Sequence, residues 1–160
     1  MAISLYFERI RRAVGHDLLL CPAACAIVHN DDGEVLLMRR CDNGKWEPPG
    51  GFVDPDETPA QAAERETLEE TGLIVRAVRL IGLVGGKLIE HQYPNGDLVQ
   101  PLVVCFECAI LSGTLHSADG EATEFGYFRR RSLPLLSTPY PTAILFPDSS
   151  QSAFFQRTGG

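Results

Sequence analysis

Long apolar runs are missing from this sequence. No run in its 160 residues approaches the roughly 18 consecutive apolar residues that a membrane-spanning helix needs, so we expect no membrane partner. A signal peptide is also not expected, because charged side chains interrupt the apolar residues near the N-terminus. Residues 4–14 are instead interpreted as an amphipathic helix, with Leu5, Ile10 and Val14 as its apolar contacts.

Basic residues are scarce. The chain has 14 Lys and Arg residues against 21 Asp and Glu residues, and its formal net charge is −7. The acidity is local, because residues 54–70 contain seven acidic side chains and a single basic one, Arg65. We therefore do not expect the chain to bind a nucleic acid polymer through its phosphates unless a cation lies between them.

Paired cysteines are lacking as well. The chain has five cysteines, an odd number, namely Cys21, Cys25, Cys41, Cys105 and Cys108. Cys105 and Cys108 have Cys-x-x-Cys spacing, but they lie in a strand-like run whose alternation points the two thiols to opposite faces. Buried free thiols in a reducing cytoplasm are therefore a better interpretation than a metal or redox pair.

The order of the expected elements indicates one layered domain of the α+β or α/β class with a mixed sheet. We expect strands over residues 22–28, 34–40, 75–84, 98–111 and 125–129. Turns are expected at Asp31-Asp32-Gly33 and at Pro94-Asn95-Gly96-Asp97. Residues 41–46 are interpreted as a loop and residues 47–51 as a rigid connection. The chain divides into an N-terminal helical segment (1–20), a main domain (21–136) and a proline-containing tail of that domain (137–160), whose last residues we expect to be mobile.

The best-defined helix covers residues 58–71. Thr58 and Gln61 have the spacing of a capping box, Pro59 occupies the first helical position, and Gly72 is placed as a left-handed C-cap. On this helix Glu66, Glu69 and Glu70 share a sector about 100° wide. Each like-charged pair costs a few tenths of a kcal/mol, and the helix dipole disfavours negative charge in this half of the helix.

This acidic face has two interpretations, a solvated charged surface or a cation site. The rest of the helix carries a stripe of small residues, Ala60, Ala63, Thr67 and Thr71, which implies close packing on a neighbouring element. No lysine lies on the helix to balance the glutamates. Carboxylate ligands clustered in this way suit Mg²⁺ or Mn²⁺ better than Zn²⁺.

The spacing of Gly51, Glu57 and the run from Arg65 to Leu73 resembles the box of the Nudix (MutT-like) hydrolase family. Every fixed position of this 23-residue motif is matched. Thr67 and Pro48 stand where the family more often has aliphatic residues. A weaker resemblance extends over about residues 20–135 and includes the segment at Tyr93. It implies an α/β/α sandwich, a central mixed β-sheet flanked by helices.

The resemblance also implies the reaction and its residues. Family members hydrolyse the pyrophosphate bond of a nucleoside diphosphate linked to a group X, such as a nucleoside triphosphate, nucleotide sugar, ADP-ribose or CDP-alcohol. Carried onto this chain, Mg²⁺ or Mn²⁺ would be bound by Glu66, Glu69, Glu70 and the carbonyl of Gly50 or Gly51. Arg65 and Glu57 would form an orienting ion pair. Glu69 is the expected base, and Glu121 or Glu124 on a later acidic loop is the alternative base or further ligand.

Substrate recognition is weakly encoded. Arg39, Arg40 and Lys45 could hold phosphates or simply face solvent, and Trp46 could stack on a base or pack in the core. Tyr93 and Gln100 are weaker candidates of the same kind. The competing hypothesis to an active enzyme is a catalytically inactive, Nudix-like module that senses a nucleotide. The family is often dimeric, so a homodimer is a further expectation.

Overall fold

A computed structural model describes residues 5–93, 95–117 and 120–155. Several sequence-based expectations fall on positions outside these ranges. They are the first residue of the predicted N-terminal helix, Pro94 of the predicted turn, Asp119 of the acidic loop and the last residues of the tail. Within the described residues, none of the helices is long and apolar enough to span a bilayer.

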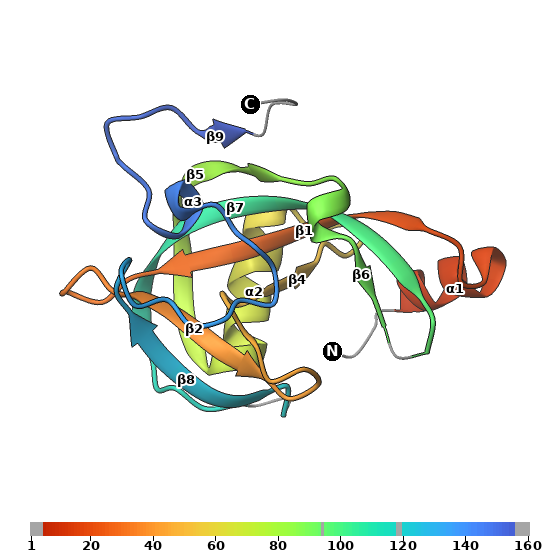
Figure 1. Ribbon diagram of the computed structural model, residues 1–160, viewed down its shortest axis with the longest axis horizontal. Coiled ribbons are helices and arrows are strands. Elements are labelled where there is room, and N and C mark those ends of the chain that lie inside the picture. The colour runs from red at the N-terminus through yellow and green to blue at the C-terminus, as the bar shows by residue number, and fades with distance from the viewer. Residues whose placement is uncertain (1–4, 94, 118–119, 156–160) are drawn as a thin grey trace.

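A mixed sheet forms the centre of the molecule (Figure 1). Its strand order is β4 (Gly50–Phe52), β1 (Leu19–Val28), β7 (Leu98–Gly113), β5 (Leu73–Val84) and β9 (Phe154–Phe155), and β6 (His91–Gln92) pairs with β7. β1 runs parallel to β7 and β9 parallel to β5, whereas the other pairs are antiparallel. A second, antiparallel sheet has the order β3 (Trp46–Glu47), β2 (Val35–Arg40) and β8 (Ala122–Phe128).

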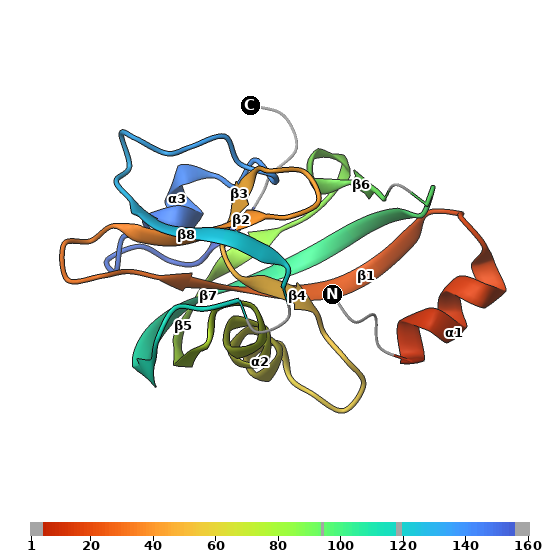
Figure 2. The same ribbon diagram turned by 90° about the horizontal axis from the view of Figure 1, so that it is seen from below.

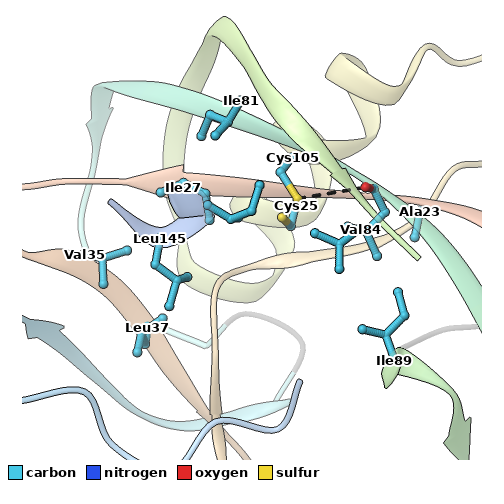
Figure 3. Packing of buried hydrophobic residues seen from close by; sticks show 12 residues of the cluster. Ala23, Cys25, Ile27, Val35, Leu37, Ile81, Val84, Ile89, Cys105 and Leu145 are labelled. Carbon is cyan, nitrogen blue, oxygen red and sulfur yellow. Dashed lines mark hydrogen bonds between the residues drawn. The ribbon is translucent and has the colours of Figure 1, made fainter. Parts of the chain in front are cut away.

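Helices cover both faces of the mixed sheet (Figure 2). α2 (Pro59–Thr71) lies on one face and α3 (Thr142–Leu145) on the other, whereas α1 (Leu5–Val14) lies beside one end of the sheet, and a 3₁₀ turn, η1, covers Lys87–Ile89. β1 sends alternate side chains to two hydrophobic clusters. One cluster joins Ala23, Cys25 and Ile27 to Ile144 and Leu145 of α3 (Figure 3). The other joins Ala24, Ala26 and Val28 to Ala62 and Ala63 of α2. The predicted α/β/α arrangement is therefore confirmed.

The cysteines behave as predicted in the core. Cys105 belongs to the cluster on the α3 side and Cys108 to the cluster on the α2 side, so their thiols lie on opposite faces of β7. All five cysteines are free thiols, and Cys41 is exposed. Burial raises the pKa of Cys108 to about 12 and that of Cys21 to about 11. These thiols are thus protonated and poorly reactive near neutral pH.

Several short elements differ from the sequence prediction, and β6, η1 and β9 have no predicted counterpart. The expected loop and connection over residues 41–51 contain the short strands β3 and β4, and the expected strand over residues 125–129 starts earlier, at Ala122. β3 is held by Met38 and Arg39 of β2, and β4 by residues 23–25 of β1. Strands of two or three residues have no periodicity of their own, so only their distant partners define them.

α2 has the predicted ends and the predicted packing face. The Thr58 side chain accepts from the Gln61 N–H, the Gln61 side chain accepts from the Thr58 N–H at 2.8 Å, and Gly72 has a φ of 72°. Ala63, Thr67 and Thr71 are fully buried, and α2 packs on β1 and β5 through these small residues. The Thr67 hydroxyl donates to the Ala63 carbonyl at 2.6 Å, which satisfies it inside the apolar interface.

Candidate active site

Two of the three box glutamates lie between α2 and β4. Glu66 is 5% exposed and Glu70 is 1% exposed, and the Gly50 N–H donates to the Glu70 Oε2 at 2.8 Å. A Cβ atom added to Gly51 would lie 2.4 Å from the Glu66 Oε1. Gly51 is therefore required because it leaves room for the Glu66 carboxylate against the backbone.

Arg65 connects the box loop, the helix and the strand. Its Nη2 and Nε donate to the two carboxylate oxygens of Glu57 at 2.7 and 3.1 Å, so the predicted ion pair is present in bidentate form. Nη2 also donates to the Phe52 carbonyl at 3.1 Å, and Nη1 donates to Glu66 at 2.9 Å and to Glu69 at 3.2 Å. The hydrogen bonds from Arg65 lower the pKa of Glu57. Arg65 thus fixes β4 beside the C-terminal half of α2.

The box glutamates differ in their environments. Burial raises the pKa of Glu66, although Arg65 acts in the opposite direction. The Glu69 side chain is 51% exposed, because the 100° sector that holds the three carboxylates extends from the buried face of α2 to its solvent edge. The three carboxylates therefore share one angular sector of the helix, as expected. They do not share one environment, because Glu66 and Glu70 are buried and Glu69 is half-exposed.

The oxygen donors fit a hard divalent cation, but they are not yet gathered around one. Among the described residues, no three His, Cys, Asp or Glu side chains come together in a way that would already hold a metal ion. Arg65 occupies the space between Glu66 and Glu69, so a cation held by both would replace this contact. The buried carboxylates of Glu66 and Glu70, beside the Gly51 backbone, form a cradle whose charge a cation would offset.

Two neighbouring cavities adjoin β4. The larger, of about 270 Å³, is lined by Phe7, Arg11, Leu19, Met38, Arg40, Cys41, Asp42, Phe52, Tyr93, Asn95, Asp97, Val99 and Glu121. The smaller, of about 110 Å³, is lined in part by Glu47, Gly50, Gly51, His91 and Tyr140. Arg40, Phe52, Tyr93 and Val99 line both. Gly50 and Gly51, which contact the buried carboxylates, thus line the smaller cavity, and the next residue, Phe52, lines both.

The predicted substrate residues separate into two groups. Arg40 and Tyr93 line both cavities, and Arg40 is ion-paired with Glu47 and, at 2.6 Å, with Asp42. Three other candidates, Arg39, Lys45 and Trp46, are not among the described residues that line either cavity.

The second group has other contacts. Arg39 pairs with Glu124 at 3.4 Å, and Lys45 is exposed. The Trp46 ring packs edge-on against Phe128 with centroids 4.8 Å apart, which favours the core interpretation. Gln100 lies 3.4 Å from the Glu90 carboxylate.

The acidic loop contributes one residue to the larger cavity. Glu121 lines it, whereas Glu124 is exposed and paired with Arg39. Sequence reasoning missed Phe7 and Phe52 as cavity residues. The position of Phe52 directly after the glycine pair is a signal that could have identified it, but nothing near Phe7 indicates that α1 reaches the site.

Comparisons with known proteins point to one family. The family model described as the NUDIX domain matches residues 19–145. A MutT-like protein of Streptomyces ambofaciens is 44% identical over 79 residues, which cover 49% of this chain and 51% of that protein. An ADP-ribose pyrophosphatase of Methanocaldococcus jannaschii is 33% identical over 116 residues, 71% of this chain and 64% of that protein. The chain thus spans between half and two thirds of these relatives.

A solved structure supports the fold. The crystal structure of an ADP-ribose pyrophosphatase from Streptococcus suis superimposes with a TM-score of 0.62, covering 85% of this chain and 96% of that one. Its sequence identity is 23%, so the likeness concerns the fold alone. Together with the intact box and the match over most of the chain, the buried carboxylates and their arginine show that this chain belongs to the Nudix (MutT-like) hydrolase family.

Proposed function

We propose that this chain is a pyrophosphohydrolase that depends on Mg²⁺ or Mn²⁺ and cleaves a nucleoside diphosphate linked to a group X. The observation that carries the proposal is the pair of buried carboxylates, Glu66 and Glu70, against the Gly50–Gly51 backbone. Arg65 donates to Glu66 at 2.9 Å, and a divalent cation beside both carboxylates could take its place, since buried carboxylates need a positive partner. The smaller cavity adjoins the Gly50–Gly51 backbone and leaves space for a substrate beside this pair.

The residues of the box have different proposed roles. Glu66 and Glu70, with the Gly51 carbonyl, would hold the cation. Arg65 with Glu57 fixes β4 relative to α2. When bound, the cation neutralises phosphate oxygens and lowers the pKa of a water molecule. Glu69 is half-exposed and accepts the proton of the attacking water, and Glu121 at the larger cavity is the alternative base or further ligand.

The substrate is proposed as a small nucleotide. The two relatives named above carry the descriptions MutT-like protein and ADP-ribose pyrophosphatase, and they leave several X groups open, ADP-ribose among them. Arg40 and Tyr93 are proposed to contact the substrate, because both line the cavities beside the box. A cytoplasmic location, a homodimer and the absence of a nucleic acid polymer as partner remain predictions from the sequence.

The proposal is tested with a panel of nucleoside diphosphate derivatives and nucleoside triphosphates, incubated with Mg²⁺ or Mn²⁺ and scored by product identity. We expect at least one substrate to yield a nucleoside monophosphate and the phosphorylated X group, and chelation of the metal to stop the reaction. Nucleotide binding without cleavage across the panel would favour the inactive sensing module instead.

Mg²⁺ is expected to raise the melting temperature of the chain. A cation at about 100 times its Kd adds roughly 2.7 kcal/mol, or about 5 °C or more for a domain of this size. Glu66→Gln removes one charged ligand, so the shift should shrink markedly. The matched control is Glu64→Gln, because Glu64 lies on the same helix and accepts from the Ala77 N–H at 2.8 Å. Equal Mg²⁺-induced shifts in both variants, measured by scanning calorimetry, would contradict the assignment.

A further inference from the structure

α1 forms part of the wall of the larger cavity, although it lies outside the family match. The NUDIX domain match begins at residue 19, whereas α1 ends at Val14. Phe7 is 5% exposed, and its ring centroid lies 4.7 Å from that of Phe52, which follows Gly51 directly. An element that precedes the matched region therefore reaches the strand that carries the box glycines.

Asp97 anchors α1 to the hairpin between β6 and β7. It is 7% exposed, its Oδ1 lies 2.7 Å from the His16 Nδ1, and its Oδ2 lies 3.6 Å from the Arg11 Nε. Arg11 also donates to the Leu98 carbonyl at 3.2 Å. The same hairpin supplies Tyr93 to the cavity. Two segments far apart in the chain are thus joined around one space.

The lining of the cavity favours a planar ring over a phosphate. Three aromatic side chains, Phe7, Phe52 and Tyr93, line it. Its charged side chains are two arginines and three carboxylates, Arg11, Arg40, Asp42, Asp97 and Glu121, which is not a lining that attracts an anion. At about 270 Å³ it lies just below the range of about 300–1,000 Å³ for sites that hold a whole small molecule. The space suits one ring system of a larger substrate.

We propose that Phe7 is a specificity-determining residue and that the cavity it lines receives the base of the nucleotide. This inference rests on the proposed function, since it assigns the non-reacting part of the same substrate. Aromatic side chains stack on the faces of bases, and polar side chains in the same lining can form hydrogen bonds with the edges of a base. The phosphates then lie toward Gly51 and the buried carboxylates, on the other side of Phe52.

The test measures binding of uncleavable ligands by calorimetry to the full chain with Mg²⁺. The probes are the four nucleoside 5′-monophosphates and, as a ligand without a base, ribose 5-phosphate. We expect the wild type to bind at least one nucleoside monophosphate more tightly than ribose 5-phosphate. Phe7→Leu keeps an apolar side chain but removes the ring, so it should weaken that nucleotide about tenfold and leave ribose 5-phosphate unchanged. Leu5→Ala is the matched control, because Leu5 is 72% exposed on the same helix.

A second measurement does not depend on a variant. Nuclear Overhauser contacts between the Phe7 ring protons and the base protons are expected in the nucleotide-bound wild type. Their absence, an unchanged nucleotide affinity in Phe7→Leu, or equal binding of nucleotide and ribose 5-phosphate by the wild type would each overturn the inference. Base contacts to Phe7 in a chain that cleaves no substrate would instead overturn the proposed function and leave this inference standing.

Discussion

Replacing Glu70 with glutamine is expected to lower turnover by about 10²-fold or more while the chain stays folded. Glutamine has nearly the same shape, and its side-chain oxygen can still accept the Gly50 N–H that Glu70 accepts at 2.8 Å. The negative charge that we assign to cation binding is lost. The measurement is kcat at saturating substrate and Mg²⁺, together with the melting temperature.

Glu64→Gln is the control for this experiment as well. Glu64 also accepts a strand N–H at 2.8 Å, but it lies outside the set of box carboxylates. Loss of a charge from α2 in general would affect both variants alike, whereas loss of a metal ligand affects only Glu70→Gln. Turnover at the wild-type level in Glu70→Gln would show that this carboxylate takes no part in the reaction.

Gly51→Ala is expected to lower both turnover and stability. Its Cβ would lie 2.4 Å from the Glu66 Oε1 and 2.5 Å from the Glu66 Cδ, so the carboxylate must move. Glu66 is buried and held by Arg65, so overpacking should cost about 1–3 kcal/mol in the free energy of unfolding. A displacement of about 1 Å in a positioned group costs roughly 10²-fold in rate. Urea denaturation and steady-state kinetics measure the two effects.

The two effects of Gly51→Ala can be separated. Adding Glu66→Ala removes the clashing side chain, so it should restore most of the stability but none of the turnover. Gly85→Ala is the control glycine, since its Cβ would lie 3.2 Å from the Leu102 Cδ1, the end of a flexible side chain, and has no other neighbour closer than 3.9 Å. Full activity in Gly51→Ala would mean that the Glu66 position is not critical.

The sequence predicts features that depend on interactions within a few residues more accurately than features that depend on distant partners. α2 was predicted with both of its ends because Thr58, Gln61 and Gly72 act on their own helix within a few residues. β3, β4 and β9 have two or three residues each and depend on partners elsewhere in the chain. Their local sequences contain no repeat long enough to distinguish a strand from a loop.

The candidate site shows the same contrast between local and long-range interactions. The family resemblance implies a contact between Glu57 and Arg65 that the structure contains, and Glu57 directly precedes the N-cap of the helix that carries Arg65. The exposure of Glu69 was not predictable from its helix angle. It depends on where β4 covers α2 and where Arg65 reaches, and both are set by contacts outside the helix.

The amino-acid sequence by itself determined the acidic helix, its caps and the set of box residues, since each is a pattern within 23 consecutive positions. Only the tertiary structure decided that Glu66 and Glu70 are buried against Gly50 and Gly51, and that Phe7 and Tyr93 line the cavity beside them. The physical reason is that burial and cavity walls arise from packing between distant segments, here through the parallel pairing of β1 with β7 and the docking of α1 at Asp97. No local periodicity encodes those contacts.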